Sequence, residues 1–513
     1  MMTQSPFNFK NIIILLIFTF IFINVSCRKN FDTIPGNADF RIEKDTLFLD
    51  SVFTGIASHT YRFKIYNTSN KDITLNKIYL EHGEQSFYRL NVDGDAGKSF
   101  DDVLIHARDS IFVFVELTAD INQLTDPVYE EKLFVQDDGK TDDILLTSFV
   151  KDAYFYYPER YPDGSKETLT LYTDPDTGET TEVYGFFLDG NTTFNADKPI
   201  VIYGHLAVPD GSTLSIEEGA HLYFHYNSGI IVWENASLVV NGTLENKVIF
   251  EDDRMEPAFE DKAGMWNYIW LRENSKNNVI NYAIIKNAEV GIVAYPTNDP
   301  QPVLRINNTQ FYNHSIAGIY GIATTIEGEN LVMNNFGLSA ISLQLGGNYS
   351  FKHCTFANYG GGIRNEKSGA VYVSNYIKTQ DQILVYDLQN FTMRNCIAYG
   401  NSAIEFYLDK DENAAFNYQI SNSLIKFNDP QNHFSDIEEV NFDDTNHYQN
   451  ILINQDPVFE NEQENKMAIG DNSPCIDQGD INTAQQVPLD ILSVNRTQHP
   501  DLGAYQHISF SNH

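Results

Sequence analysis

A six-residue pattern recurs along the second half of the chain and limits the fold more than any other feature. The pattern is an apolar residue, any residue, one of Tyr, Asn, Gly or His, a small or polar residue, any residue, and an apolar residue. Its copies begin at Ile280, Ile306, Ile326, Phe351, Met393 and Ile420, with spacings of 26, 20, 25, 42 and 27 residues. A repeat of this period is typical of a solenoid, in which each repeat stacks on the next.

The register of these copies makes two further predictions. The 42-residue interval is about two repeats long, and Val373–Ile377 is a degenerate copy inside it, so the solenoid runs without a break. The third position of the pattern holds Asn308, Asn395 and Asn422. This shared position predicts a ladder of Asn side chains at one bend, each amide bonding the next.

The segment that precedes the copies carries a family resemblance. The runs 208–222, 236–244, 248–250 and 266–271 resemble the first turns of right-handed parallel β-helix proteins of the pectin-lyase-like kind. The resemblance implies a β-helix over residues 196–470, with about twelve turns of roughly 23 residues each.

The region before the solenoid has the short alternating pattern of β-strands. Five runs show it most clearly, and they lie at residues 46–49, 61–66, 73–75, 111–115 and 131–135. Five or more such strands in about a hundred residues favour a β-sandwich over residues 40–150. The run 67–75, with Phe87-Tyr88 and the run 105–110, resembles the immunoglobulin-like modules of bacterial surface proteins. The expected fold class is therefore all-β, an immunoglobulin-like sandwich followed by a right-handed parallel β-helix.

Residues 151–195 are a transition segment rich in Tyr, Pro, Asp and Gly. Within it, Asp174-Pro175-Asp176 precedes Gly178 and could begin a Ca²⁺ loop. The fifth and twelfth positions of such a loop need oxygen ligands, but both are glycine here, Gly178 and Gly185. A hairpin turn is therefore favoured.

The beginning of the chain has the features of an export signal. Lys10 precedes the apolar run from Ile12 to Val25, and Ser26-Cys27 follows it. A small residue before Cys resembles the processing site of bacterial lipoproteins, which implies a signal peptide over residues 1–26, lipid on Cys27 and a linker over residues 27–39. Arg28, by analogy with enterobacterial sorting, favours the outer membrane. The alternatives are a secreted protein cut near Ser26 or a short N-terminal anchor.

Charge excludes one class of partner. Against 34 Lys and Arg stand 70 Asp and Glu, a formal net charge of −36. Such a chain offers no electrostatic attraction to nucleic acid, so no nucleic-acid partner is expected.

Three cysteines remain after Cys27, namely Cys354, Cys396 and Cys475. In the register above, Cys354 and Cys396 lie two turns and therefore roughly 10 Å apart, beyond the reach of a disulfide. We expect free, buried thiols.

The C-terminal segment, residues 471–513, resembles the segment that closes many bacterial surface β-helices. The resemblance rests on Asp471–Gly479 and Asp501–Tyr505, and it implies a structural cap that includes Asp477, Asp490, Arg496 and Asp501. Arg496 is expected to form an ion pair with Asp477 or Asp501.

Catalytic motifs are hard to find. Pectate lyases and polygalacturonases share the β-helix fold, but the Gly-His-Gly and Arg-Ile-Lys signatures of polygalacturonases are absent, and Gly204-His205-Leu206 only begins the first. The best local candidate is the loop Glu251, Asp252, Asp253 and Arg254, with Trp266 and Trp270 nearby. Its carboxylates and indoles could bind a sugar or a Ca²⁺ ion. The alternative is that Trp266 packs in the core and the acidic run is a hydrated loop. Asp409, Asp411 and Glu412 form a second candidate of the same kind.

These features together favour a lipid-anchored protein of the cell envelope, at the outer membrane, facing either the surface or the periplasm. Its partners would be the membrane, through the N-terminal lipid, and a glycan or surface protein bound along the solenoid without catalysis. One alternative is a polysaccharide lyase or glycoside hydrolase of the same fold, and another is a purely structural role in the envelope.

Overall fold

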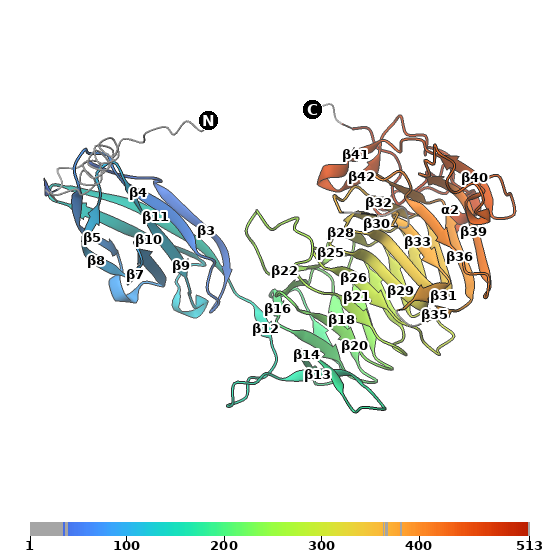
Figure 1. The fold of residues 1–513 in the computed structure, drawn as a ribbon, viewed down its shortest axis with the longest axis horizontal. Helices are drawn as coiled ribbons and strands as arrows, with labels where there is room; N and C mark the ends of the chain where they lie inside the picture. Colours follow the sequence, from blue (N-terminus) through green and yellow to red (C-terminus); the bar gives the residue numbers. More distant parts are fainter. Residues whose placement is uncertain (1–33, 36–38, 363, 365–367, 380–381, 511–513) are drawn as a thin grey trace, which may run out of the picture. The chain divides into compact units, whose positions relative to one another are not determined.

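The computed structural model describes residues 34–35, 39–362, 364, 368–379 and 382–510. Cys27 and the expected signal peptide lie outside the described residues. The described part is all-β, and the chain divides into two compact units, one ending at Lys151 and the other beginning at Asp152 (Figure 1). Within this part, no helix is long and apolar enough to cross a membrane.

The first unit consists of two β-sheets that share one core. One sheet has the order β1-β5-β10-β11-β3, with β8 paired to β5, and the other has the order β2-β4-β9-β6-β7. Buried side chains such as Phe63, Val113, Leu133 and Leu146 from both sheets meet in one cluster. The bounds are β1 (Ile34–Pro35), β2 (Phe40–Ile42), β3 (Thr46–Phe53), β4 (Tyr61–Asn67), β5 (Ile73–Leu80), β6 (Tyr88–Val92), β7 (Asp95–Gly97), β8 (Ser99–Ile105), β9 (Ser110–Leu117), β10 (Val128–Asp137) and β11 (Lys140–Lys151). The five expected strands lie within β3, β4, β5, β9 and β10, which confirms them.

The second unit is a coil of short parallel strands. Each strand pairs in parallel with a strand one turn later, and the turns build three ladders, which we call the first, second and third ladder. The first ladder contains β15 (Thr192–Phe194), β18 (Thr213–Glu217), β21 (Ser237–Asn241), β24 (Asn278–Asn281), β27 (Leu304–Asn307), the ends of β29 (Ala317–Glu329) and β31 (Ser339–Lys352), β36 (Leu388–Arg394), β39 (Phe416–Ile425) and β40 (Tyr448–Ile453). This pairing is the topology of a parallel β-helix.

The other two ladders run beside the first. The second ladder contains β12 (Tyr154–Tyr156), β16 (Ile200–Ile202), β19 (His221–Phe224), β22 (Val248–Asp252), β25 (Ala283–Lys286), β28 (Gln310–His314), β30 (Val332–Phe336), β32 (Thr355–Asn358), β37 (Ile397–Gly400) and the ends of β39 and β40. The third ladder contains β14 (Thr180–Phe187), β17 (His205–Val208), β20 (Gly229–Val232), β23 (Ile269–Leu271), β26 (Val290–Ala294), the beginnings of β29 and β31, β33 (Val371–Ser374) and β38 (Phe406–Asp409).

A few elements lie outside the ladders. They are the strand β13 (Thr168–Thr173), which forms a hairpin with β14, the hairpins β34 (Tyr376–Lys378) with β35 (Ile383–Val385) and β41 (Phe459–Asn461) with β42 (Lys466–Ile469), the 3₁₀ helices η3 (Glu438–Val440) and η4 (Glu462–Glu464), and the helix α2 (Ile481–Gln486). The β13–β14 pairing confirms the hairpin turn expected at Asp174–Gly178.

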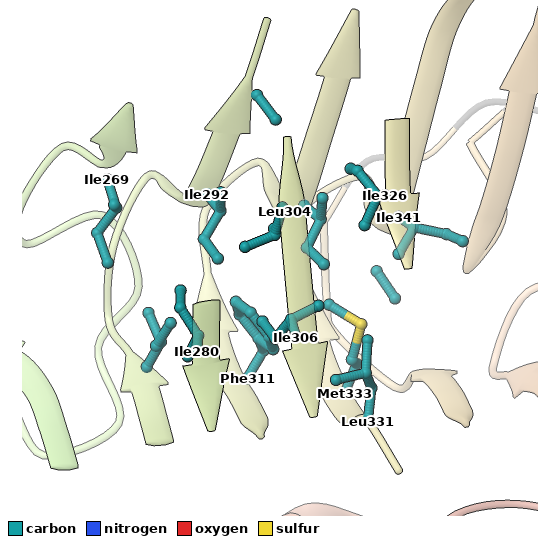
Figure 2. Packing of buried hydrophobic residues seen from close by; sticks show 14 of the residues in the cluster. Ile269, Ile280, Ile292, Leu304, Ile306, Phe311, Ile326, Leu331, Met333 and Ile341 are labelled. Atoms are coloured by element: carbon teal, nitrogen blue, oxygen red, sulfur yellow. The ribbon is translucent and has the colours of Figure 1, made fainter. Parts of the chain in front are cut away.

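Apolar residues fill the coil in stacked columns. Ile269, Ile292 and Ile341 come from separate turns of the third ladder, and all are fully buried (Figure 2). Side chains alternate between the two faces of a strand. The residues on either side of each inward residue in a ladder therefore point out of the coil.

The corner between the first and second ladders carries the expected Asn column. Asn308, Asn330, His353, Asn395 and Asn422 all have a positive φ there, a conformation that Asn tolerates better than most residues. Asn330 Nδ2 donates to Asn308 Oδ1 at 2.9 Å, and Asn395 Nδ2 lies 2.9 Å from His353 Nε2. The predicted shared position of Asn308, Asn395 and Asn422 is confirmed, but Asn422 donates to the carbonyl of Gln478 rather than to another member of the column.

The structure corrects the repeat register in two places. Ile306 pairs with Gly328, not with Ile326, so the third copy was placed two residues too early. Phe351 pairs directly with Met393, so the 42-residue interval is one turn that carries a long insertion, not two turns. The pattern misled because Gly328 stands where an apolar residue was expected; a Cβ at Gly328 would approach the ring of Phe351 to 2.7 Å.

The cysteine spacing changes with this register. Cys354 and Cys396 lie on adjacent turns, and the amide of Cys354 donates to Cys396 Sγ at 3.4 Å. The expected distance of two turns was therefore wrong. Cys354, Cys396 and Cys475 are all free and buried, as predicted.

The ladders also begin and end earlier than expected. β12, β14 and β15 lie in the supposed transition segment, yet they pair with β16, β17 and β18. The last ladder strand, β40, ends at Ile453. Among the described residues the first ladder has ten strands, fewer than the twelve turns expected, because inserted loops lengthen several turns.

The C-terminal segment packs along the side of the coil. Its buried residues, including Cys475, Ile491 and Leu502, form one cluster with Val332, Ala357, Ile397 and Leu424 from four successive strands of the second ladder. Asn395 and Asn422 of the corner column donate to carbonyls of Asp480 and Gln478. This segment therefore covers the outer face of the second ladder over four turns, which the expectation of an end cap did not foresee.

Arg496 is fixed in this segment, but not by the expected ion pair. Its guanidinium is fully buried and donates to the carbonyls of Leu489 and Gly503 and to Asn330 Oδ1 of the corner column. Asp501 instead accepts from the backbone of Asp477 and from His507, and Asp490 accepts from Leu492, Val494 and Gln506. Oxygens of the backbone and of an amide take the place of the carboxylate expected to pair with Arg496.

Candidate functional site

The acidic loop expected as a site divides its side chains between different neighbours. Glu251 on β22 accepts from His221 Nε2 at 2.5 Å and forms an ion pair with Lys286 at 2.5 Å. Burial alone would raise the pKa of Glu251, but these two partners outweigh it and lower the pKa. The carboxylate of Glu251 is therefore already neutralised by the chain itself.

The next residue, Asp252, points to the other side of the strand because side chains alternate. Asp252 is buried and accepts from Asn287 Nδ2 at 2.8 Å, and burial raises the pKa of Asp252 to about 6. Asp253 accepts from His225 Nδ1 at 2.8 Å on the outside.

The remaining members of the loop site are also occupied. Arg254 pairs with Glu256 and stacks on the ring of Phe259 at 3.7 Å. Trp266 is fully buried against Phe224, and its indole donates to the carbonyl of Lys286. Across the described residues, no group of three or more His, Cys, Asp and Glu side chains is placed to hold a metal ion.

Trp270 lies apart from the loop, on the outer face of the third ladder. It is the centre residue of β23, between the inward residues Ile269 and Leu271, and it pairs with Ile231 and Val293 of the neighbouring turns. Trp266 precedes the strand, before the chain turns into β23, and points inward. The two tryptophans expected to act together therefore lie on opposite sides of the coil wall.

Around Trp270 the outer face of the third ladder carries a continuous aromatic cluster. The ring of Trp270 meets Tyr268 and Tyr295 edge-on, at centroid distances of 6.0 and 5.4 Å. Arg272 lies over both Trp233 and Trp270, at 4.1 and 5.2 Å from the ring centroids. We call Trp233, Tyr268, Trp270, Arg272 and Tyr295 the aromatic cluster; all five side chains are partly exposed.

His205 borders this cluster. Its ring lies 5.6 Å from the ring of Tyr268, above Gly229, where a Cβ would come within 2.4 Å of the Tyr268 carbonyl. His205 Nδ1 faces the carbonyl of Tyr184 at 3.1 Å, and a carbonyl only accepts, so Nδ1 carries the proton. Burial lowers the pKa of His205, which keeps the ring neutral and leaves Nε2 as an acceptor.

Three buried polar atoms of this face have no hydrogen-bond partner among the described residues. They are Trp270 Nε1, Arg272 Nη1 and His205 Nε2, two donors and one acceptor. A buried polar group without a partner costs free energy, typically about 1–3 kcal/mol. Three such atoms gather on the face that also carries the partly exposed aromatic cluster, which makes this face the candidate for a binding site.

The β13–β14 hairpin forms one border of the site. Leu169 of the hairpin packs on Ala207 and Ile231 of the outer face, and Arg272 Nη2 donates to the carbonyl of Leu171 at 2.8 Å. This bond fixes the guanidinium over the indoles while leaving Nη1 without a partner.

Farther along the third ladder the outer face becomes more polar. Tyr320, Ser342, Tyr372 and Tyr407 follow Val293 in the same column. Asp409, one of the second set of candidates, ends β38 and accepts from the hydroxyls of Tyr372 and Tyr376 at 3.1 and 2.9 Å.

The other two members of that set lie in the following loop. Asp411 accepts from Asn413, and Glu412 pairs with Lys410. The structure therefore does not bring Asp409, Asp411 and Glu412 to one point.

Comparisons with known proteins give little guidance. No family model and no curated protein matches the chain. Among solved structures, a family 123 glycoside hydrolase from Clostridium perfringens is 8% identical, covers 22% of this chain and 25% of its own, and has a TM-score of 0.16. The catalytic domain of a GH87 alpha-1,3-glucanase in complex with nigerose is 10% identical over 72% of this chain and 82% of its own, with a TM-score of 0.20. These TM-scores are too low to support any inference about this chain.

Sequence reasoning found Trp270 but missed its neighbours. Tyr268, Trp270 and Arg272 alternate with Ile269 and Leu271, a signal that is present in the sequence and indicates one outward face. Trp233, Tyr295 and His205 belong to other turns and join this face only through the pairing of β17, β20, β23 and β26.

Proposed function

We propose that this protein binds a glycan along the outer face of the third ladder, without catalysis. The observation that carries the proposal is the aromatic cluster together with the partnerless polar atoms of Trp270, Arg272 and His205. Sugar rings offer apolar C–H faces that pack on aromatic rings, and hydroxyls that both donate and accept hydrogen bonds. One ligand class therefore satisfies both features of the face.

The location that suits this function is the bacterial cell envelope. In this proposal Cys27 carries a lipid at the outer membrane, and an immunoglobulin-like unit precedes a right-handed β-helix that presents the binding face. The acidic loop supports the non-catalytic part of the proposal, because its charged side chains Glu251, Asp253 and Arg254 are each paired within the chain.

The test is binding and product release measured together. The purified protein is titrated with a panel of neutral and anionic polysaccharides, and the reaction is followed for new reducing ends and unsaturated products. We expect binding to at least one glycan and no product. Trp270→Ala should weaken binding at least tenfold, a loss of about 1.4 kcal/mol.

The matched control is Tyr226→Ala, which removes a ring that is 61% exposed and lies outside the third ladder. It should bind as the wild type does. Absence of glycan binding by the wild type would overturn the proposal, and released product would overturn its non-catalytic part.

A further inference from the structure

A second feature of the same outer face is a slot between two tyrosines. Tyr320, Ser342 and Tyr372 occupy the same column on three consecutive turns. Ser342 is the small residue, so the tyrosine rings stand two turns, about 9.6 Å, apart at roughly 4.8 Å per turn. A hollow of about 280 Å³ opens here, and these three residues line it together with the polar residues Ser339, Gln344 and Ser368 and three apolar residues.

One wall of the slot is held firmly. Tyr372 stacks on Tyr407 with an interplanar angle of 8°, and its hydroxyl donates to Asp409 at 3.1 Å. The other wall, Tyr320, follows Val293 in the column and is partly exposed. Because its neighbours fix the ring of Tyr372, the slot exists before a ligand arrives, which reduces the entropic cost of binding.

The slot offers polar groups to a ligand but no charge. Ser342 Oγ accepts from Gln344 Nε2 at 3.1 Å, and none of the residues that line the hollow is charged. An anionic ligand would lose water here without gaining a counter-charge. A purely apolar ligand would cover the hydroxyl and amide groups without bonding to them.

We propose that this slot holds one uncharged sugar ring, inserted between Tyr320 and Tyr372 with its hydroxyls toward Ser342 and Gln344. The inference rests on the proposed glycan binding and deepens it. The aromatic cluster and the slot lie on the same ladder three turns apart, from Trp270 on β23 to Ser342 on β31. A chain of sugars that runs along the coil would therefore contact both.

The test fills the slot with the residue already found on either side of it. Ser342→Tyr extends the tyrosine column, and Ser342→Ala keeps the slot open. The probes are neutral gluco-, xylo- and manno-oligosaccharides of one to eight residues, with uronate oligosaccharides of matched length, measured by calorimetry. We expect Ser342→Tyr to lower the affinity for the longer neutral oligosaccharides at least tenfold, and Ser342→Ala to stay within threefold of the wild type.

A second variant guards against misfolding. Tyr320→Ala removes one wall without adding volume, and it should lower the same affinities at least threefold while the circular dichroism spectrum and the unfolding midpoint stay near those of the wild type.

If Ser342→Tyr and Tyr320→Ala bind as the wild type does, while Trp270→Ala does not, the slot is excluded and glycan binding stands. Uronate oligosaccharides could also bind better than neutral ones, with a binding that Ser342→Tyr abolishes. That result would contradict the proposal that the ligand of the slot is uncharged. If the wild type binds no oligosaccharide, both proposals fail.

Discussion

The outer faces of the second and third ladders are built from the same kind of strand, but one is covered by the chain and the other is partly exposed. On the second ladder, Val332, Ala357, Ile397 and Leu424 are aliphatic and fully buried beneath the C-terminal segment. On the third ladder, the aromatic cluster stays partly exposed, and Trp270 Nε1 and Arg272 Nη1 have no partner in the described part of the chain.

The contrast separates what the fold needs from what it leaves available. Where the chain covers its own face, the side chains are aliphatic, and the corner residues Asn330, Asn395 and Asn422 bond to the covering segment. Where aromatic rings and partnerless donors gather instead, folding gains nothing from the donors. Such a face is explained better by a ligand than by stability.

The largest effect is expected from Arg496, which joins the C-terminal segment to the corner column. Arg496→Ala removes three buried hydrogen bonds, those to the carbonyls of Leu489 and Gly503 and to the amide oxygen of Asn330, and among the described residues only the Leu489 carbonyl keeps another donor, Asn330 Nδ2. Each such loss costs about 1–3 kcal/mol, so we expect the free energy of unfolding to fall by at least about 3 kcal/mol in denaturant titrations.

The control for this prediction is Arg305→Ala. Arg305 is 38% exposed and pairs with Glu327, which is 51% exposed. An exposed pair contributes about 0–1 kcal/mol. Equal losses in the two variants would show that the C-terminal segment is not held by Arg496.

A smaller difference is expected between one aliphatic residue on each face. Ile397→Ala removes buried methylene groups under the C-terminal segment and should cost about 2–4 kcal/mol. Val293→Ala removes a partly exposed side chain beside Trp270 and should cost less than about 1 kcal/mol. Similar unfolding free energies for the two variants would mean that the second ladder is not covered as described.

The sequence predicted the coil and the corner better than the faces. A positive φ at a corner restricts the residue type, so Asn308, Asn395 and Asn422 marked their positions directly. The register failed at Ile326 because apolar residues at neighbouring positions allow a two-residue shift, and only the pairing of Ile306 with Gly328 decides it.

Insertions and outer faces could not be predicted because both depend on which residues pair across turns. The residues inserted on either side of β33 are together close in length to one turn, so length alone could not distinguish an extra turn from loops. Tyr268, Trp270 and Arg272 show outward alternation in the sequence, but Trp233 and His205 join them only through pairing across turns. The covering of the second ladder depends on residues such as Cys475 that join one buried cluster with Ile397, far away in sequence.

The smallest expected effect concerns pH and the covered face. Burial, and then the charge of Arg496, hold the pKa of His353 well below its usual range, so the ring is neutral when folded. The unfolded chain binds a proton at His353 below its ordinary pKa of about 6.5 while the folded chain does not. Stability is therefore lost as the pH falls through 6.5 toward 5, by up to about 1.4 kcal/mol per pH unit.

His353→Asn tests this dependence without changing the corner. Asn occupies the same corner position at Asn330 and Asn395, so the positive φ of 51° at residue 353 suits the variant. The difference between unfolding free energies at pH 7 and pH 5 should be smaller in His353→Asn than in the wild type. His205 on the third ladder also has a lowered pKa, so part of the pH dependence should remain. An unchanged difference would show that His353 is not buried neutral beneath the C-terminal segment, and the covering of the second ladder would need to be revised.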